Sequence, residues 1–268
     1  MLPQVFLERM QGLLGSEYEE FLVSFDHEKY QALRLNPLKL RTESGRTDDS
    51  TVIEEKIQQT FRLHPVPWAD NGYYYTKEDQ PGKHPWHEAG LYYIQEPSAM
   101  APVTLLSPQP GERILDLCAA PGGKSTHARS VLPVGSLLVA NEVMRNRSQV
   151  LAENLIKWGN AEVVVTNNDP ADFTSLTEVF DVVLADVPCS GEGMFRKDPV
   201  AVEEWSTDNV QVCWQRQRRI LADIWPALKP GGLLIYSTCT YNREEDEKNV
   251  AWIADELGVE ILKVPVVS

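Results

Sequence analysis

Two cysteines stand at the ends of two apolar, strand-like segments of this 268-residue chain. Cys189 follows LADVP at residues 184–188, and Cys239 follows IYST at residues 235–238. A thiolate is a strong nucleophile that can add covalently to a substrate. If the two segments are neighbouring strands, their ends lie about 4.8 Å apart and both thiols face one crevice. The spacing does not say which thiol reacts.

The same two thiols could instead have a purely structural role. A cysteine in a core behaves as a small apolar residue, and two neighbouring cysteines can form a disulfide. The chain has four cysteines, at positions 118, 189, 213 and 239, without a C-x-x-C pair or a His/Cys cluster of metal-ligand spacing, so we predict no metal site. The N-terminus lacks the basic start of a signal peptide. We therefore expect a cytoplasmic protein with reduced thiols and no membrane segment.

The charge of the chain argues against an extended nucleic-acid surface. The formal net charge is −14, whereas nucleic-acid-binding domains usually carry a basic footprint. Basic residues nevertheless cluster locally, which leaves a basic groove possible on an acidic protein. These clusters occur at residues 34–41, 145–147, 196–197 and 216–219.

The texture of the sequence changes near residue 97, which predicts two domains. Residues 1–96 begin with a helical pattern over 1–25 and continue with short strands and loops rich in Pro, Gly and aromatic residues, typical of a small α+β domain. Residues 97–268 alternate apolar runs with helical patterns, which predicts a doubly wound, mostly parallel α/β sheet. The apolar runs lie at 113–119, 136–142, 161–168, 181–188, 232–239 and 259–267, and the last helix is expected at 242–258, with a capping box of Asn242 and Glu245.

The ends of the first three strands predict a pocket for an adenosine-containing ligand. In such sheets, ligands bind at the carboxyl ends of the strands. The first strand runs into DLCAAPGGKSTHA at 116–128, where small residues let a ligand approach the backbone. Glu142 at the second strand end could bind ribose hydroxyls, and Asp169 at the third an adenine amino group. Alternatively, Glu142 caps the next helix and Asp169 belongs to a plain turn. The glycine spacing of a phosphate-binding P-loop is missing before Lys124.

Several of these segments together resemble the Sun/Fmu-type RNA cytosine methyltransferases, in the branch that acts on bacterial small-subunit (16S) rRNA. The segments are DLCAAPGGKSTHA, DVPCSGEGMFRKDP, LKPGGLLIYSTCTYNREEDE, LRLNPLK and YYIQEPSAM. The resemblance covers nearly the whole chain. It implies a Rossmann-like class I methyltransferase fold, S-adenosylmethionine as methyl donor and carbon 5 of cytidine in RNA as acceptor. It also implies an N-terminal α+β domain at 1–96 that serves as an RNA-binding or linker domain, and a methyltransferase domain at 97–268.

The resemblance assigns roles to individual residues. Cys239 is expected to add to carbon 6 of cytosine, Cys189 to assist its release, Asp186 to bind the pyrimidine edge, and Lys124 to lie near the cofactor tail or the target base. The residues implied to line the cofactor are Cys118, Ala119, Ala120, Pro121, Gly122, Gly123, Lys124, Glu142, Arg147, Asp169 and Asp186.

One departure from the family concerns the end of the chain. The family's domain continues with an antiparallel strand and a further RNA-binding domain, both of which we expect to be lacking here. Residues 259–267 are then expected to form an edge strand with a vacant neighbour. Two alternatives remain open: a methyltransferase of another substrate class, and an inactive RNA-binding remnant.

Overall fold

The computed structural model describes residues 2–40, 48–159 and 161–264. The chain divides into two compact units. Unit 1 comprises Met1–Lys29, Pro188–Arg219 and Thr238–Glu260, and unit 2 comprises Tyr30–Val187, Ile220–Ser237 and Ile261–Ser268. In the described part of the chain, no helix has the length and apolarity needed to cross a membrane.

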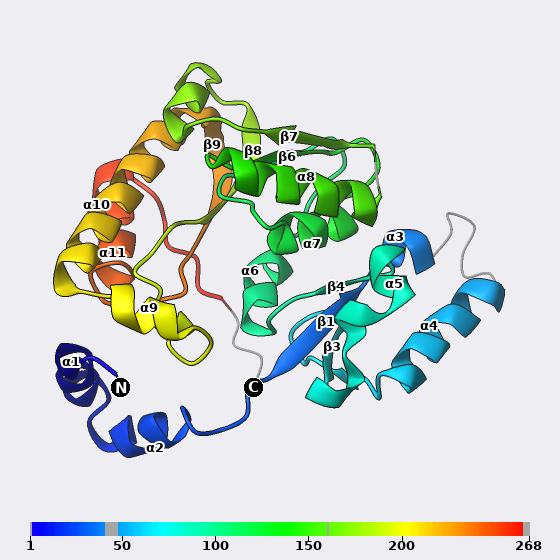
Figure 1. The fold of residues 1–268 in the computed structure, drawn as a ribbon. Helices are drawn as coiled ribbons and strands as arrows, with labels where there is room; N and C mark the ends of the chain where they lie inside the picture. The colour runs from blue at the N-terminus through cyan, green and yellow to red at the C-terminus, as the bar shows by residue number, and fades with distance from the viewer. Residues whose placement is uncertain (1, 41–47, 160, 265–268) are drawn as a thin grey trace. The chain divides into compact units, whose positions relative to one another are not determined.

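A five-stranded parallel sheet forms the centre of unit 2. Its strands are β5 (Arg113–Asp116), β6 (Leu137–Asn141), β7 (Val163–Thr166), β8 (Phe180–Asp186) and β9 (Leu228–Ser237), in the order β7-β6-β5-β8-β9. The order reverses between β5 and β8, which is the switch point where such sheets bind ligands. The predicted doubly wound α/β fold is confirmed (Figure 1).

Crossover segments connect the parallel strands. α6 (Ala101–Thr104) precedes the sheet, α7 (Gly123–Val131) connects β5 to β6, α8 (Arg145–Trp158) connects β6 to β7, and α10 (Thr207–Ile224) precedes β9. α7 packs beside α8 (Figure 1). The strands and α7 share an apolar core, which is the reason for the near-continuous apolar runs in the sequence. The core contains Val103, Ile114, Ala128, Leu132, Leu138, Val182, Leu184 and Ile235.

A smaller antiparallel sheet precedes the parallel one in unit 2. Its strands are β1 (Gln31–Leu35), β2 (His64–Pro65), β3 (Gly72–Tyr75) and β4 (Tyr92–Ile94), in the order β2-β3-β1-β4, and α3 (Pro37–Leu40), α4 (Asp48–Thr60) and α5 (Pro85–Glu88) accompany them. The core of this sheet contains Leu33, Leu35, Leu40, Ile57, Phe61 and Tyr92. The predicted α+β segment is therefore confirmed, and its aromatic residues contribute to a core.

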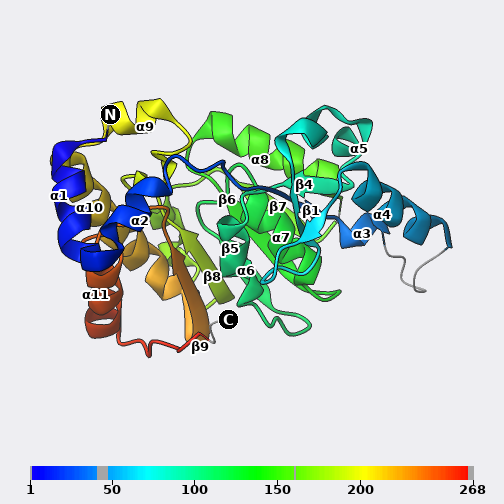
Figure 2. The same cartoon turned by 90° about the horizontal axis from the view of Figure 1, so that it is seen from below.

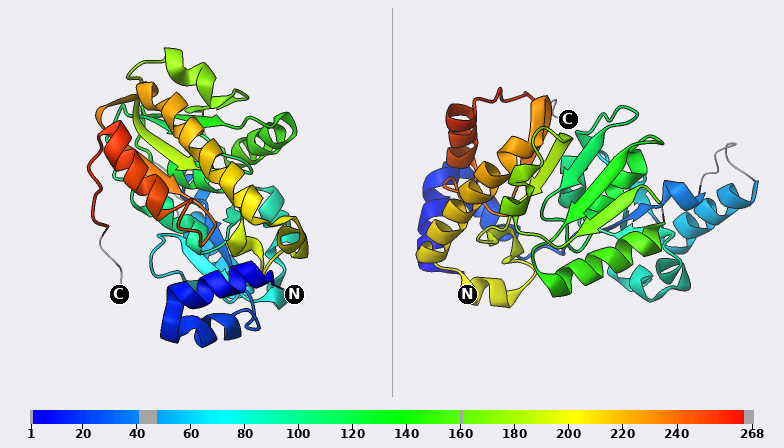
Figure 3. Two further views of the ribbon diagram at one scale, coloured as in Figure 1. Left: turned by 90° about the vertical axis from the view of Figure 1, so that its left-hand side faces the viewer. Right: turned by 90° about the horizontal axis from the view of Figure 1, so that it is seen from above.

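Unit 1 is helical. It contains α1 (Gln4–Leu14), α2 (Tyr18–Val23), α9 (Pro199–Glu204), the N-terminal part of α10, and α11 (Glu247–Leu257). α10 and α11 lie side by side, and α1 packs against the N-terminal part of α10 (Figures 2 and 3). The buried face of α1 packs against the segment that follows Cys189, in a core of Phe6, Met10, Phe195, Trp205 and Val210.

Three local predictions were wrong. The helical pattern over 1–25 forms two helices instead of one, because the chain turns at Gly15, whose φ is 54°. The last helix begins at Glu247 rather than near Asn242, although it ends at Leu257 with Gly258 as the expected C-cap. Over the described residues 259–264 the chain forms no strand, and residues 265–267 lie outside the described part.

Candidate active site

The ends of β8 and β9 bring a small polar cluster together in unit 2. The two strands pair in parallel, with Asp186 opposite Ser237, so the predicted neighbourhood of these strand ends is confirmed. The Ser237 hydroxyl donates to Asp186 Oδ1 at 2.7 Å, and Lys124 Nζ, from the first turn of α7, lies 2.7 Å from Asp186 Oδ2. Asp186 is therefore held by two neighbours, while its side chain stays 35% exposed. It can still bind a ligand.

The two thiols meet in unit 1. Cys189 Sγ and Cys239 Sγ are 3.3 Å apart, and the Cys239 backbone N–H donates to Cys189 Sγ at 3.4 Å. A disulfide joins its sulfurs at about 2.05 Å, so the pair consists of two free thiols. The sequence prediction that the two thiols come together is confirmed by this contact.

The environments of the two thiols differ. Cys239 is exposed, whereas Cys189 is partly buried. The pKa of the Cys189 thiol lies far above its usual range, chiefly because of its hydrogen bond with the Cys239 thiol and then because of burial. Cys189 therefore keeps its proton at neutral pH and can donate it toward Cys239. The exposed Cys239 sulfur is the one that a substrate can approach.

Backbone contacts fix the loop that carries Cys239. Gly193 N–H donates to Cys239 O at 2.8 Å. A Cβ at Gly193 would lie 2.8 Å from the same oxygen, so a larger residue would push the two segments apart. Glycine in CSGEG therefore permits a close approach between the segment after Cys189 and the segment that contains Cys239.

Glu192 connects this loop to helix α1, and the sequence analysis missed it. Its carboxylate is buried and accepts from Arg9 Nη2 at 2.6 Å, Trp205 Nε1 at 3.1 Å and the Tyr241 N–H at 3.2 Å. An acidic residue inside an otherwise small or apolar turn, three residues after Cys189, was a signal that could have identified it. Glu192 thus connects the segment that follows Cys189 to the segment that follows Cys239.

The predicted cofactor loop lies between β5 and α7 in unit 2. Gly122 has a φ of 112°, which favours glycine, and α7 begins at the next residue. Arg147 Nη2 donates to Ala120 O at 2.9 Å, and Asn154 Nδ2 donates to Pro121 O at 2.8 Å. The loop from Cys118 to Lys124 is therefore held in place by the helix that follows β6.

Two carboxylates at adjacent strand ends carry oxygens without a hydrogen-bond partner in the described structure. Asp116 Oδ1, at the end of β5, and Glu142 Oε2, directly after β6, are both buried. Ser125 Oγ donates to the other oxygen of Asp116 at 2.6 Å, and Met144 N donates to the other oxygen of Glu142 at 2.9 Å. Arg147 Nη1 lies 3.2 Å from Glu142 Oε2. Acceptors of this kind fit a ligand that brings hydroxyl or ammonium donors.

Burial sets the protonation of this region. It raises the pKa of Asp116 to about 6, although Ser125 and Lys124 partly oppose the shift. Burial, with the carboxylates of Asp116 and Glu142 nearby, raises the pKa of the Cys118 thiol well above its usual range. The Cys118 thiol is therefore neutral at pH 7, and Cys118 would line the predicted cofactor site as an uncharged residue. Asp116 was not among the predicted site residues, because it is a single acidic residue between the apolar residues Leu115 and Leu117.

Asp169 has a local role in the structure. Its side chain accepts from Ala171 N at 3.1 Å and forms a capping box with Asp172 at the turn Pro170–Ser175. These contacts agree with the alternative that Asp169 belongs to a plain turn. A role of Asp169 in binding a ligand stays a prediction. In the described residues, no group of three or more His, Cys, Asp or Glu side chains is placed to hold a metal ion.

Comparison with known proteins identifies relatives of both parts of the chain. A family model described as 16S rRNA methyltransferase RsmB/F matches residues 103–266, and one described as the N-terminal domain of 16S rRNA methyltransferase RsmF matches residues 2–97. The chain is 36% identical over 266 residues to the ribosomal RNA small subunit methyltransferase F of Aliivibrio fischeri, covering 96% of this chain and 55% of that protein. It spans about half the length of the curated relatives it matches.

Solved structures share the fold. A methyltransferase homolog protein from Pyrococcus horikoshii superposes with a TM-score of 0.78 at 29% identity, covering 94% of this chain and 78% of that one. The structure of NSun6 from Pyrococcus horikoshii with SFG gives a TM-score of 0.80 at 20% identity, covering 95% of this chain and 87% of that one.

Proposed function

Because the chain belongs to the 16S rRNA methyltransferase RsmB/F family, we propose that it transfers a methyl group from S-adenosylmethionine to carbon 5 of a cytidine in RNA. The proposed RNA is small-subunit rRNA, in line with the names of its relatives. The observation that carries the proposal is the contact of Cys189 Sγ and Cys239 Sγ at 3.3 Å, with the exposed sulfur on Cys239. A methyltransferase of another substrate class has no use for such a pair.

Two thiols suit this chemistry because carbon 5 of cytosine is a poor nucleophile. When the thiolate of Cys239 adds to carbon 6, the electron pair of the 5,6 double bond becomes available at carbon 5. After methylation, a base such as a solvent water takes the proton from carbon 5, and the electron pair of that C–H bond restores the double bond and expels the Cys239 thiolate. The Cys189 thiol, which holds its proton beside Cys239 Sγ, can donate a hydrogen bond to the departing thiolate and thereby assist release.

Lys124 and Asp186 are proposed to bind the polar edge of the target base or the tail of the cofactor. Their ion pair of 2.7 Å, supported by Ser237, fixes a carboxylate three residues before Cys189 in the sequence. Such a carboxylate can accept from the exocyclic amino group of cytosine and favour the protonated ring nitrogen. Protonation there withdraws electrons from carbon 6 and promotes attack by the thiolate.

S-Adenosylmethionine supplies an electrophilic methyl group on a sulfonium when it is bound. The residues proposed to hold it are the loop Cys118–Lys124 with Asp116, Glu142, Arg147, Asp169 and Asp186. Two buried oxygens that accept no hydrogen bond in the described structure, Asp116 Oδ1 and the Glu142 Oε2 beside Arg147, support this assignment, because the cofactor brings hydroxyl and ammonium donors. Residues 1–96 are proposed to form an RNA-binding or linker domain that precedes the methyltransferase domain.

A transfer assay tests the function directly. The purified chain, incubated with tritiated S-adenosylmethionine and unmodified 16S rRNA, should place the label on carbon 5 of cytidine, and Cys239→Ala should abolish the transfer. Cofactor binding without transfer to any RNA, together with transfer to a protein or a small molecule, would contradict the RNA assignment.

A further inference from the structure

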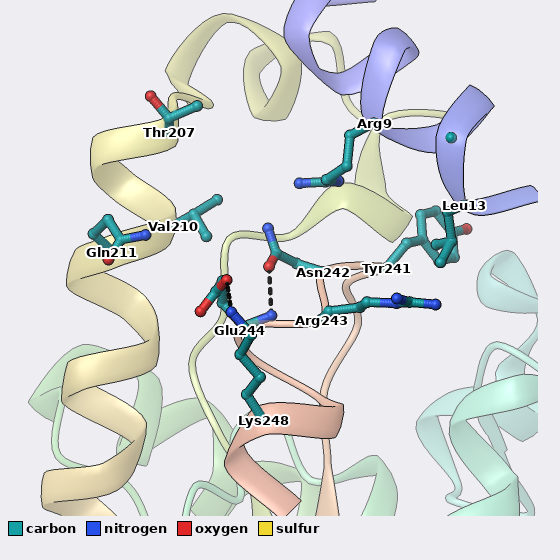
Figure 4. A pocket seen from close by; sticks show the side chains of 11 residues that line it. Arg9, Leu13, Thr207, Val210, Gln211, Tyr241, Asn242, Arg243, Glu244 and Lys248 are labelled. Atoms are coloured by element: carbon teal, nitrogen blue, oxygen red, sulfur yellow. Dashed lines mark hydrogen bonds and ion pairs between the residues drawn. The ribbon is translucent and has the colours of Figure 1, made fainter.

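Unit 1 contains a pocket that the proposed catalytic groups do not occupy. Its cavity of roughly 530 Å³ lies between α1, α10, the loop after Cys239 and the start of α11 (Figure 4). Four of its lining side chains are charged, and three of these are basic: Arg9, Arg243 and Lys248, against the single acid Glu244. On a chain of net charge −14, such a local excess of positive charge marks a site for an anion.

The three basic side chains are not equally available. Lys248 pairs with Glu244 at the rim, and Arg9 pairs with the buried Glu192 through Nη2. Arg9 Nε, however, is buried without a hydrogen-bond partner in the described structure. Arg243 is exposed, and within the described residues no acidic side chain forms an ion pair with it. The pocket therefore has one arginine free to bind and a second with a spare donor.

The pocket belongs to the same loop as the proposed nucleophile. Tyr241 lies two residues after Cys239, and Arg243 lies four residues after it. Even a fully extended chain therefore places the Cα of Arg243 at most about 14 Å from the Cα of Cys239. Tyr241 is 40% exposed, and its ring packs edge-on with the Phe21 ring, with 5.9 Å between the ring centroids. An exposed, braced ring of this kind is a surface on which a base or ribose can stack.

We propose that this pocket binds the phosphodiester next to the target nucleotide, with Arg243 as its main contact and the Tyr241 ring against the adjoining sugar or base. The inference rests on the proposed function, since it takes RNA as the substrate, and it adds a site outside the cofactor loop and the thiol pair. An arginine fits phosphate through two parallel N–H groups. Anchoring the neighbouring phosphate would hold the strand while the target cytidine is unstacked.

The test uses short RNAs that contain the target cytidine and one neutral methylphosphonate at a time. For the wild-type chain, neutralising one phosphate beside the target should weaken binding about tenfold. Arg243→Gln should bind the all-phosphate RNA about tenfold more weakly and lose its sensitivity at that one position. Arg216→Gln is the matched control: it removes an exposed arginine of the same unit from α10, outside the pocket, and should keep the wild-type pattern.

A second variant tests the volume of the pocket rather than its charge. Gly12 on α1 lines the pocket, and a Cβ there would meet no atom within 4 Å apart from the backbone of its own helix, so Gly12→Leu can extend into the pocket without a clash against another segment. It should weaken RNA binding while cofactor binding stays unchanged. Equal RNA affinities for Arg243→Gln and Arg216→Gln, with methyl transfer intact, would overturn the inference alone. Position-specific coupling of Arg243 to a phosphate without any methyl transfer would instead contradict the proposed function alone.

Discussion

Cys189 Sγ lies 3.3 Å from Cys239 Sγ and accepts from the Cys239 backbone N–H at 3.4 Å, so two contacts hold the two cysteines together. The raised pKa of Cys189 makes it the proton holder of this pair. The exposure of Cys239 makes it the sulfur that a substrate meets. Two thiols placed in this way predict different consequences when each is removed.

Cys239→Ala is expected to neither methylate RNA nor form a covalent complex. Cys189→Ala should still add to the base, but its release should stall, so a protein–RNA adduct should accumulate that survives a denaturing gel. The measurement is the fraction of labelled RNA that migrates with the protein. Cys213→Ala, which removes a buried cysteine outside the pair, serves as a control. The reverse pattern, with adduct from Cys239→Ala only, would make Cys189 the nucleophile.

Glu142→Ala is expected to weaken binding of S-adenosylmethionine by about 1–3 kcal/mol, the cost of leaving hydrogen-bonding groups without partners. Its Oε2 is buried and accepts no hydrogen bond in the described structure, and Arg147, whose Nη1 lies 3.2 Å from this oxygen, would lose its ion pair. Calorimetric titration measures the change. Glu153→Ala, at an exposed position of α8, is the matched control and should bind normally. Equal affinities for both variants would remove Glu142 from the site.

Cofactor binding should depend on pH through Asp116. Burial raises the pKa of Asp116 to about 6, so the folded chain holds this proton more tightly than the unfolded chain does, and the stability gained from it is lost as the pH rises through 6. A ligand that donates to Oδ1 favours the ionised form. Affinity should therefore fall below pH 6, by at most about tenfold per pH unit. Titrations between pH 5 and 8 should show this slope, and Asp116→Asn should abolish it; a slope that survives in Asp116→Asn would assign it to another group.

The sequence predicted the architecture because apolar runs determine which segments are buried in a parallel sheet. All five strands of that sheet and the adjacency of the Cys189 and Cys239 segments follow from such runs. The failure at residues 259–264 has a physical cause: an apolar pattern predicts a strand only if a partner covers it. Ile261 and Leu262 are instead 60% and 62% exposed.

Tertiary contacts explain the residues that sequence patterns placed wrongly or missed. Glu245 matched a capping box, but its buried carboxylate accepts from Ser190 N at 2.9 Å and Gln217 Nε2 at 2.8 Å. Asn242 caps a preceding turn through Glu244 N. The partners of Glu245 lie 55 and 28 residues away in the chain, so no local pattern reveals them. The same holds for Glu192, whose partner Arg9 is 183 residues distant.

Glu192→Gln is expected to lower the stability of unit 1. The substitution keeps the size of the side chain, but it removes the charge that faces Arg9 at 2.6 Å and an acceptor for Trp205 or the Tyr241 N–H. Loss of a hydrogen bond to a buried charged group costs about 1–3 kcal/mol. Glu244→Gln, which breaks the solvent-exposed pair with Lys248, should cost at most about 1 kcal/mol. Urea unfolding measures both, and equal midpoints would contradict a central role for Glu192.

Arg34→Lys is expected to weaken both the fold and the cofactor loop. Arg34 on β1 is buried and contacts α7: Nη2 donates to Thr126 Oγ1 at 2.7 Å and to the Gly123 carbonyl at 3.3 Å, while its guanidinium lies 4.7 Å from the centroid of the Trp158 ring. Burial lowers the pKa of Arg34 to about 9, which means that removing this charge from water costs free energy that its contacts must offset.

A lysine offers one donor point instead of a planar fork, so it cannot serve Thr126, Gly123 and the Trp158 face together. Because Gly123 is the first residue of α7, directly after the loop, we expect a lower melting temperature and also weaker binding of S-adenosylmethionine. Arg216→Lys, at an exposed position of α10, should change neither quantity. A lower melting temperature with unchanged cofactor affinity would show that Arg34 supports the packing of β1 on α7 without positioning the loop.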